Sequence, residues 1–570
     1  MTGVPVDARA RAGAWAGLLA ILLLAAFLRL DGASFGLPAV FNADEPHHVN
    51  VAVSFARGSL NPGVFKYPTL WMYVLFAAYG VSFALWSGFG LLRSAADFGG
   101  LFVWHPEGFY LLGRLLAAAC SLAGLGLVLR SGERLLGRRG GLLAAALLAV
   151  SPALVVSAHA AKPDSLMFLL SAAAWLCAVR HYDDGGEAPL MLCGVFAGLA
   201  ASTQYTAAPL AALVPAAAFA RALDGGSPRP AREANALRAA VTLSAKALGC
   251  WFLGFLGGSP FIALDGRAFL RDVRDQGTVV GAGGPVGWAV LGNAAAFAGP
   301  WAVGGPLLAG GALLLLLRER AKALLLLGPC VVLLVPLALS PEGGWQRYQL
   351  SVFPAYALAA AFFVERVLAA LPARAPLFPL ALLALALPGA AQCRAFDREL
   401  VLPDTRSLAA DWLERERPGA AVLTDQEHAS PPLRMSREQV AELLERTRAE
   451  GHPRARYYEL MLRSHPGGGR RVLRILRSGA DLRSGTWHAG WSARGRAVLD
   501  VREGLSAARA AGVEVVALSS SGADPARSPE LAAFFAALEQ EGRPLAVFMP
   551  APGERRGPVI RILDIRRRKR

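Results

Sequence analysis

A short acidic and histidine-rich stretch, FNADEPHH at residues 41–48, holds the side chains best suited to chemistry. It places Asp44 and Glu45 beside His47 and His48, directly after the first apolar run of the chain. A charged side chain at the centre of a bilayer costs roughly 2.5–3.5 kcal/mol, so we expect this cluster at a membrane surface. A carboxylate in that position can act as a general base that removes a proton from an acceptor hydroxyl.

Three more segments between apolar runs carry charged and aromatic side chains. They are FKYPTLWMY at 65–73, HAAKPD at 159–164 and GWQRYQLSVFP at 344–354. With the acidic stretch they supply carboxylates, cations and imidazoles: Asp44, Glu45, Asp164, Lys66, Lys162, Arg347, His47, His48 and His159. Lysine and arginine stabilise charge that develops on a departing phosphate. A base combined with paired cations is what group transfer from a phosphate ester requires.

Each of these residues also has a purely structural interpretation. Asp44 and Glu45 could be interfacial charges, and Lys66 could be an anchor whose ammonium group reaches the membrane surface. Asp164 could cap the helix that begins with SLMFLL, a role compatible with catalysis. Arg347 could contact lipid headgroups only. The sequence leaves these alternatives open.

A divalent metal site is a further alternative for the same stretch. Its candidate ligands are Glu45, His47, His48 and His159. The DEPHH spacing differs from the HExxH pattern of zinc enzymes, and the chain has no CxxC pair. The glycines at 281, 283 and 284 are not a phosphate-binding loop, because the strand before and the helix after such a loop are missing. The six cysteines predict no disulfide framework.

The composition is that of a polytopic α-helical membrane protein. Of 570 residues, 54% are hydrophobic, and the mean hydropathy is +0.41; long apolar runs recur until residue 392. The net charge of +16 could suggest nucleic acid. Much of the arginine, however, falls in short loops between apolar runs, where basic residues fix membrane orientation. We therefore expect no nucleic-acid partner.

About eleven transmembrane helices are predicted from the apolar runs. They lie at 14–30, 109–130, 141–158, 165–181, 188–202, 206–221, 247–263, 295–317, 323–339, 350–368 and 376–392. The first is interpreted as a retained span and not as a cleaved signal peptide. The basic loops, such as 132–141, then share one side with the N-terminus, which we predict to be cytoplasmic. The outer loop 264–290 has the composition of a mobile lid.

Residues 69–91 are ambiguous, because their length would also cross a bilayer. Their aromatic residues and the orientation of the neighbouring loops favour an outer-face juxtamembrane helix. Residues 44–58 are predicted to form a short surface helix.

From these elements we predict a transmembrane domain at 1–395 and an extracytoplasmic α/β domain at 396–570. In the latter, the strand-like runs are AAVLT, RVLRIL, VEVVAL, LAVFM and VIRILDI.

The order of these motifs resembles the GT-C glycosyltransferases. The resemblance lies in the Asp-Glu pair after the first span, Phe-Lys-Tyr-Pro before an aromatic helix, the outer turn that ends in Pro-Asp, and a late Arg-Tyr segment. It is strongest to the bacterial branch of family 39, related to protein O-mannosyltransferases and lipid A aminoarabinose transferases. PDTRSLAADWL, VEVVALSSSG and GPVIRILDI resemble the extracytoplasmic domains of bacterial members.

The resemblance implies specific roles. Asp44 matches the catalytic base and Glu45 its neighbour, Lys66 matches a phosphate-binding lysine, and Asp164 matches the acidic residue of the second outer loop. Arg347 matches the late arginine near the carrier phosphate. We assign further substrate contacts to residues in the same segments and in one short outer turn: Tyr67, His48, His159, Lys162, Tyr205 and Tyr348.

The resemblance also implies the reaction. We expect an inverting, phospholipid carrier-dependent glycosyltransferase of a bacterial inner membrane, which moves a sugar from a polyprenyl-phosphate to a protein, lipid or glycan acceptor outside the cytoplasm. A transporter or flippase of lipid-linked saccharides is the second hypothesis. It predicts mid-membrane charges and repeat symmetry, which the sequence lacks. An inactive scaffold with the same fold is the third. The sugar, the acceptor and the oligomeric state stay open.

Overall fold

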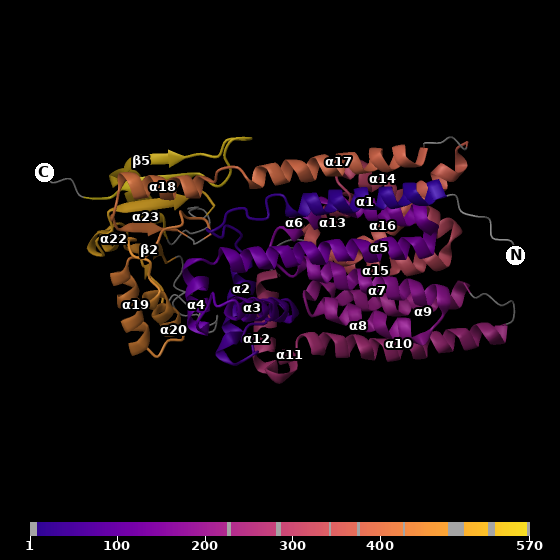
Figure 1. Cartoon of the computed structure of the whole chain (residues 1–570). Coiled ribbons are helices and arrows are strands. Elements are labelled where there is room, and N and C mark those ends of the chain that lie inside the picture. The colour runs from indigo at the N-terminus through magenta and orange to yellow at the C-terminus, as the bar shows by residue number, and fades with distance from the viewer. Residues whose placement is uncertain are drawn as a thin grey trace. The chain divides into compact units, whose positions relative to one another are not determined.

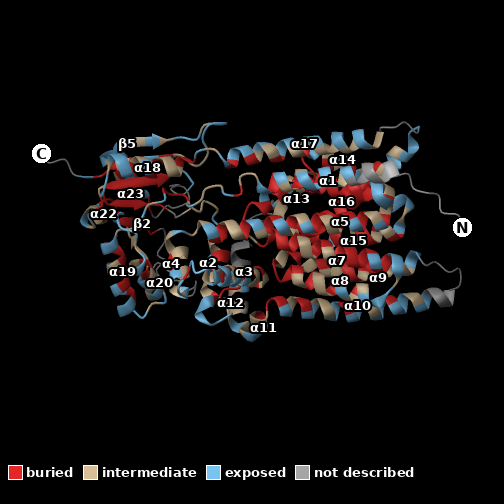
Figure 2. Ribbon diagram, viewed as in Figure 1, coloured by how far each residue is buried: buried red, intermediate tan, exposed pale blue. Residues whose placement is uncertain are grey.

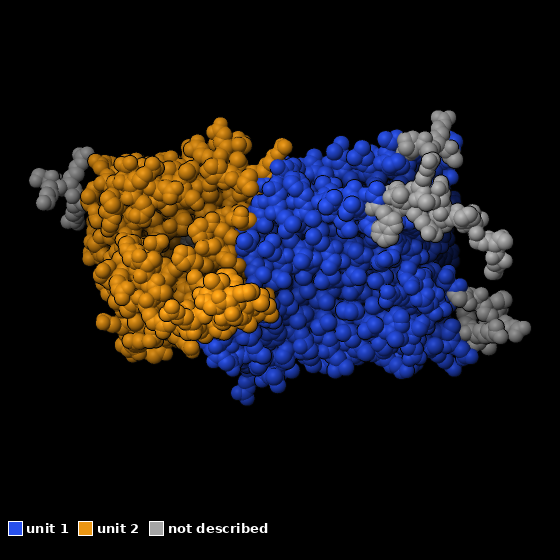
Figure 3. Space-filling view, viewed as in Figure 1, with its two compact units in different colours: residues 1–33, 47–77, 111–397 blue, residues 34–46, 78–110, 398–570 orange. Residues whose placement is uncertain are grey.

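The computed structural model of the chain describes residues 8–224, 230–280, 287–340, 344–372, 377–425, 428–476, 495–521 and 531–566. The chain forms two compact units, drawn in different colours in Figure 3. The first comprises residues 1–33, 47–77 and 111–397, and the second comprises residues 34–46, 78–110 and 398–570. Two segments from the N-terminal part of the chain therefore belong to the same unit as the C-terminal region.

The first unit is helical. Its elements, some of which extend past its boundaries, are α1 (Ala8–Leu30), α2 (Glu45–Ser54), η1 (Phe55–Arg57), α3 (Leu70–Gly88), α5 (Glu107–Ala149), α6 (Pro152–Ala158), α7 (Asp164–Asp184), α8 (Glu187–Ala201), η2 (Tyr205–Ala212), α9 (Leu213–Asp224), α10 (Pro230–Gly258), α11 (Phe261–Leu264), α12 (Gly266–Val280), α13 (Trp288–Ala295), α14 (Trp301–Arg318), α15 (Arg320–Leu339), η4 (Gln346–Val352), α16 (Phe353–Ala370) and α17 (Leu377–Leu400). Figure 1 shows α8 between α7 and α10, and α14 beside α16.

The predicted spans fall on these helices. In the described part of the chain, nine helices are long and apolar enough to cross a membrane. α5 contains the predicted span 109–130 and the first part of the span 141–158. The apolar part of α1 and the whole of α8 are shorter than the other spans. The chain is thus a multi-pass membrane protein, as predicted. α3 also has the length and composition of a span, so its surface position stays a prediction.

Burial within the first unit follows from the bilayer as solvent. α7 and α16 are mostly buried, whereas α10 and α17 are largely exposed (Figure 2). On α17, Leu383 and Leu387 are 62% and 60% exposed, and Leu253 on α10 is 68% exposed. Contiguous exposed leucines are unfavourable in water but not against lipid chains. These faces are therefore suited to contact the bilayer.

The predicted basic loop at 132–141 is not a loop. α5 runs through it, with one break at Gly137, where φ is 79°. A Cβ at Gly132 would lie 2.6 Å from Gly141 Cα. The chain therefore reverses within helical segments, because glycine permits both the positive φ and the close approach. The loop prediction was wrong because basic residues indicate which side of the membrane a segment lies on. They do not require that the segment is non-helical.

The next predicted span, 141–158, is interrupted between α5 and α6. Pro152 lacks the N–H that would bond the Leu148 carbonyl, so the helix ends. The fully buried Arg29 of α1 supplies donors instead. Its guanidinium donates to Ala149 O at 2.8 Å, to Leu148 O at 3.2 Å and to Ser121 Oγ at 2.8 Å.

The outer segment 264–290, predicted as a lid, is largely helical. It begins at the end of α11 and contains α12, whose polar and apolar residues separate onto two faces. The charged residues that suggested a loop form one face of this helix. The glycines at 281, 283 and 284 lie outside the described residues.

The second unit contains the C-terminal α/β region. Its elements are α4 (Ala95–Trp104), α18 (Thr405–Glu416), β1 (Val422–Thr424), α19 (Arg437–Ala449), α20 (Ala455–Arg463), β2 (Val472–Ile475), β3 (Val498–Leu499), α22 (Ser506–Ala510), β4 (Val515–Ser519), α23 (Ala532–Glu541), β5 (Arg543–Phe548) and β6 (Ile560–Asp564). The sheet order is β3-β2-β1-β4-β6-β5. β3, β2, β1 and β4 are parallel, and β6 pairs antiparallel with β4 and β5. The strand-like runs in the sequence are confirmed, and β3 is additional.

α4 packs on the C-terminal region within this unit. The Trp104 indole donates to Met461 O at 3.1 Å and lies edge-on to His465. A Cβ at Gly100 would lie 3.1 Å from Ser464 Cβ, so a small residue is needed for this approach. The segment between α3 and α5 is therefore part of the soluble fold.

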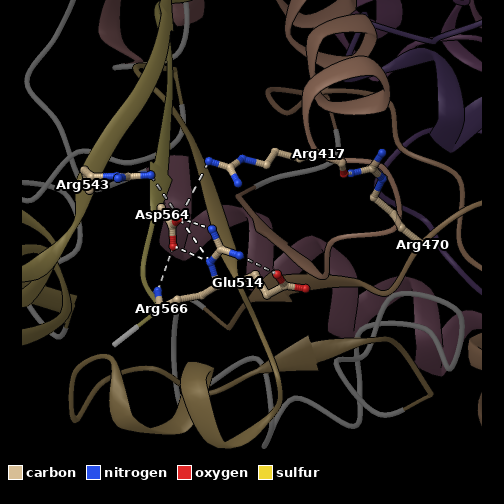
Figure 4. A network of polar contacts seen from close by, with 6 residues as sticks. All are labelled: Arg417, Arg470, Glu514, Arg543, Asp564 and Arg566. Carbon is tan, nitrogen blue, oxygen red and sulfur yellow. Dashed lines mark hydrogen bonds and ion pairs between the residues drawn. The ribbon is translucent and has the colours of Figure 1, made fainter. Parts of the chain in front are cut away.

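Asp564 at the end of β6 holds together the last strands of the sheet (Figure 4). Its carboxylate accepts from the Arg566 side chain at 2.6 Å and from the Arg566 backbone N–H at 2.9 Å. Arg417 and Arg543 lie within 3.9 and 3.7 Å of the same carboxylate. Mainly the hydrogen bonds from Arg566, and then the surrounding positive charge, lower the pKa of Asp564 below its ordinary value.

An Asp564→Asn variant should therefore lower the stability of the C-terminal region by about 1.5–3 kcal/mol, the range for hydrogen bonds to a charged group. A lowered pKa stabilises the fold above the unfolded-state value of about 4, and this stabilisation is lost as the pH falls through the folded-state value. Amide hydrogen exchange of β4 and β6 in the full-length protein measures the effect. Asp411→Asn, on the exposed side of α18, is the matched control, and equal protection in both variants would contradict the prediction.

Candidate active site

The loop that carries Lys66 is fixed through its neighbour Phe65. The Phe65 N–H donates to Asp272 Oδ2 on α12 at 2.8 Å, and the Tyr205 hydroxyl donates to Phe65 O at 3.1 Å. The Phe65 ring is buried and meets Phe269 edge-on. Lys66 itself is exposed. The backbone is thus fixed on both sides while the ammonium group faces outward.

Asp272 is a residue that the sequence analysis did not single out, and it makes a prediction of its own. Asp272→Ala should raise the exchange rate of the Phe65 amide about 10-fold or more, because the bond to a charged acceptor is lost. Asp272→Asn keeps a side-chain carbonyl and should preserve most of the protection. Hydrogen exchange with fragment resolution at residues 61–69 measures both variants. Wild-type exchange of the Phe65 amide in the Asp272→Ala variant would show that Asp272 does not hold the loop.

An aromatic cluster surrounds this loop. The rings of His47 and His48 lie 5.2 and 4.8 Å from the ring of Tyr67, and the Lys66 ammonium lies 6.0 Å from the same ring. His48 is buried, whereas His47 and Tyr67 are partly exposed. The structure therefore brings together four residues from the first two predicted segments.

The turn at 159–164 lies against the same loop region. The Trp71 indole of α3 donates to Ala161 O at 3.0 Å, and a Cβ at Gly113 would lie 2.7 Å from Ala161 Cβ. This packing fixes the turn that carries Lys162, whose side chain is 12% exposed, and that leads into α7 at Asp164. Two of the predicted segments are therefore adjacent within the first unit.

Asp164 is 1% exposed, and its Oδ2 lies 3.7 Å from the Lys162 ammonium. Its Oδ1 is buried and has no hydrogen-bond partner among the described residues. The capping alternative is not observed, since α7 begins at Asp164 itself and no side chain caps it. A buried carboxylate oxygen without a donor is costly, by about 1–3 kcal/mol or more. Asp164 is therefore able to accept a hydrogen bond from a hydroxyl that enters the site.

Arg347 lies in η4, the element that connects α15 and α16. Its guanidinium carbon is 5.2 Å from the Trp345 ring and 5.4 Å from the Tyr348 ring. The buried Gln349 fixes η4 by donating to Val290 O on α13 at 2.9 Å. η4 also packs against α6, α7 and η2, so Arg347 belongs to the same end of the first unit as Lys162 and Tyr205.

An apolar groove opens beside this element. It has a volume of about 330 Å³ and lies between α13 and α15. Its lining residues are Gly287, Trp288, Val290, Leu291, Leu334, Val335 and Ala338. Trp288 at its edge is 85% exposed. α13 contributes to the groove and also receives the Gln349 bond, so the groove adjoins the element that carries Arg347.

His159 does not fit the role of metal ligand or substrate contact. Its Nδ1 lies 2.8 Å from Val155 O, its Nε2 lies 2.8 Å from Asp31 O, and the ring is 1% exposed. The buried ring therefore lies between a carbonyl of α6 and the carbonyl of Asp31, directly after α1. Across the described ranges, no group of three or more His, Cys, Asp or Glu side chains is close enough to hold a metal ion. Glu45, His47, His48 and His159 thus do not form the candidate metal site.

Asp44 and Glu45 belong to the second unit. Glu45 is fully buried and is the first residue of α2, and Asp44 directly precedes it. The Asp44 N–H donates to Asn42 Oδ1 at 3.0 Å. The start of α2 is stabilised by negative charge at its positive dipole end. Both carboxylates therefore lie at the boundary between an ordered loop and a helix.

The comparisons with known proteins can now be set beside this geometry. Residues 111–231 match the family described as dolichyl-phosphate-mannose-protein mannosyltransferase. A comparison with curated protein sequences found no match.

Solved structures share the fold over nearly the whole chain. The chain is similar to ArnT from Cupriavidus metallidurans bound to undecaprenyl phosphate, with a TM-score of 0.51 and 15% identity over 97% of this chain and 98% of that one. It is also similar to the archaeal oligosaccharyltransferase AglB from Archaeoglobus fulgidus in complex with an inhibitory peptide and a dolichol-phosphate. That match has a TM-score of 0.50 and 13% identity over 96% of this chain and 74% of that one. The chain therefore has the GT-C fold of membrane glycosyltransferases, and its residues 111–231 match the dolichyl-phosphate-mannose-protein mannosyltransferase family.

Proposed function

We propose that the protein is an inverting glycosyltransferase that moves one sugar from a polyprenyl-phosphate carrier to an acceptor on the outer side of a bacterial inner membrane. The observation that carries this proposal is the fold match over almost the entire chain to a protein bound to undecaprenyl phosphate. The proposal places the N-terminus in the cytoplasm, in keeping with the basic loops of the sequence.

Asp44 is assigned as the general base. Its carboxylate takes the proton from the acceptor hydroxyl while the acceptor oxygen bonds to the anomeric carbon of the sugar. The bond between that carbon and the phosphate oxygen breaks, and the polyprenyl phosphate leaves with the electron pair. One displacement at the anomeric carbon inverts its configuration. Glu45, adjacent in sequence and buried, is assigned as the neighbour of the base.

Lys66 and Arg347 are assigned to the departing phosphate. Negative charge develops on the leaving oxygen during the reaction. A cation stabilises this charge best when the cation is already held in place. The double attachment of Phe65 and the packing of η4 support this role, because they limit the movement of both segments. Asp164 is assigned to bind a hydroxyl of the acceptor or the sugar. Its buried Oδ1 can accept a hydrogen bond from that hydroxyl.

The remaining contacts are assigned by their neighbourhood. Tyr67 and His48 lie within the aromatic cluster around Lys66, Lys162 lies beside Asp164, and Tyr348 contacts Arg347. The apolar groove between α13 and α15 is suited to an isoprenoid chain, since its lining is apolar and it adjoins η4. A carrier held there would have its phosphate close to the end of the unit that bears Arg347.

The test uses the purified full-length protein in proteoliposomes that contain undecaprenyl-phosphate sugars. Mass spectrometry should detect free undecaprenyl phosphate and a glycosylated product when extracts of the cell envelope supply the acceptor. Envelope glycans compared with and without the gene identify the product in cells. Movement of the intact donor between leaflets without cleavage would support the transporter instead. Neither cleavage nor movement would support the inactive scaffold.

A further inference from the structure

Residues 34–46, which lead to the candidate base, belong to the same compact unit as the C-terminal region. Two phenylalanines in this segment contact arginines of that region. The Arg406 guanidinium carbon lies 3.7 Å from the centroid of the Phe41 ring, and that of Arg556 lies 5.2 Å from the centroid of the Phe35 ring. Arginine stacked at such a distance attracts the face of an aromatic ring.

Both arginines are held by one carboxylate. Asp404 accepts from Arg406 Nε at 2.8 Å and Nη2 at 2.7 Å, and its Oδ2 lies 3.3 Å from Arg556 Nε. The third guanidinium nitrogen of Arg406 donates to His428 O at 2.5 Å. The side chains of Asp404, Arg406 and Arg556 are 5%, 11% and 12% exposed. The guanidinium facing Phe41 is therefore fixed in orientation and shielded from water.

The backbone around these residues is equally constrained. The Thr405 N–H donates to Arg556 O at 2.9 Å, and the Arg556 N–H donates to Pro403 O at 3.0 Å. Gly557 has φ of 104°, and a Cβ there would lie 2.4 Å from Thr405 Oγ1 and 2.8 Å from Asp404 Oδ1. Only glycine fits this approach. The start of α18 and the loop between β5 and β6 are thus joined at the arginine pair.

The segment also folds compactly on itself. Gly36 has φ of 70°, and a Cβ there would lie 2.8 Å from Phe41 Cδ2. The Phe41 ring consequently packs on the Gly36 backbone as well as on Arg406. Asp44 follows Phe41 by three residues, which is a contour of at most about 11 Å. A displacement of the ring is therefore transmitted to the carboxylate over a short path.

We propose that Arg406 and Arg556 form an arginine clamp through which the C-terminal region positions Asp44 for proton transfer. This inference rests on the proposed function, in which Asp44 is the base. Arg406 and Arg556 are positioning residues, because they act through Phe41 and Phe35. The C-terminal region would then be required for the rate of the reaction and not only for acceptor contact.

The first experiment measures local order in the full-length protein in nanodiscs. Arg406→Ala should raise amide exchange in residues 39–46 about 10-fold, while exchange of β1 and β4 stays at the wild-type level. Arg406→Lys should show the same faster exchange as the alanine variant. Lysine cannot form a bidentate pair with Asp404 and stack on the Phe41 ring at the same time. Phe41→Tyr keeps the aromatic face and should preserve protection, whereas Phe41→Leu should not. Arg415→Ala, on the same helix, is the matched control.

The second experiment measures transfer kinetics in the same variants. Arg406→Ala and Phe41→Leu should lower kcat on the order of 10- to 100-fold with little change in the donor KM, because misplacement of a reacting group acts on the chemical step. Phe41→Tyr should retain the wild-type kcat, because it keeps the aromatic face. The Arg406→Ala, Phe41→Leu double variant should be no slower than either single variant, since both remove one contact.

The outcomes separate the two proposals. Faster exchange at 39–46 together with the loss of kcat supports the clamp. In a protein that transfers sugar, the clamp proposal is overturned if Arg406→Ala leaves amide exchange at residues 39–46 unchanged. It is also overturned if exchange becomes faster while kcat stays at the wild-type value. A wild-type protein that transfers no sugar overturns the proposed function and the catalytic part of this inference, whereas the exchange measurement still reports whether the contacts order the segment.

Discussion

Asp44→Asn is expected to lower kcat for sugar transfer by about 10²- to 10⁴-fold, the contribution of a positioned general base. The amide has the shape of the carboxylate but does not accept the hydroxyl proton. Carrier binding should change little, because the assigned phosphate contacts are Lys66 and Arg347. The measurement is the initial rate of undecaprenyl phosphate release at saturating donor, with donor affinity measured separately.

Two comparisons make the Asp44 result decisive. Glu45→Gln should have a smaller effect on kcat if Glu45 supports the base without accepting the proton. Asp97→Asn, in α4 of the same unit, should leave the rate unchanged, since its partner is Arg463 in the soluble fold. If Asp44→Asn retains the wild-type rate, another residue is the base, and the assigned mechanism is wrong.

Removing the assigned phosphate contacts is the second large expected effect. Lys66→Met should lower kcat/KM about 10²- to 10³-fold, because the fixed cation stabilises the leaving phosphate in the transition state. Methionine keeps an unbranched apolar side chain, so the loss reports the charge. Arg347→Met should have an effect of the same order, and a less than additive double variant would show that both cations act on one group.

The controls for this prediction test charge alone. Lys246→Met removes a lysine of α10, whose ammonium lies 3.6 Å from Glu187 and whose side chain is 58% exposed. It should leave kcat/KM unchanged. Lys66→Arg keeps the charge and should recover part of the rate. A Lys66→Met protein with full activity would assign Lys66 to membrane anchoring, the alternative that the sequence leaves open.

Candidate residues for the site could be named from the sequence because their signal is local. Charged side chains between long apolar runs must lie at a membrane surface, so the segments with Lys66, Asp164 and Arg347 were recognisable without coordinates. Apolar runs of strand type likewise predicted the strands β1, β2, β4, β5 and β6.

Other features have no local signal. Asp272 is one of several charged residues in a polar stretch, and only its bond to Phe65 N distinguishes it. His159 is close to Lys162 in sequence, yet its ring is buried between two backbone carbonyls. The break at Gly137 within a helix, in place of a basic loop, depends on the close packing of Gly132 and Gly141.

The sequence alone determined that the chain crosses the membrane several times and that its C-terminal region is α/β, because hydrophobic periodicity and charge act over neighbouring residues. The tertiary structure alone decided which distant segments share a unit. Phe41 and Arg406 are far apart along the chain, and their contact cannot be predicted from the two residue types. Packing between such residues depends on the whole fold, which is why the attachment of the Asp44 segment to the C-terminal region emerged only from the structure.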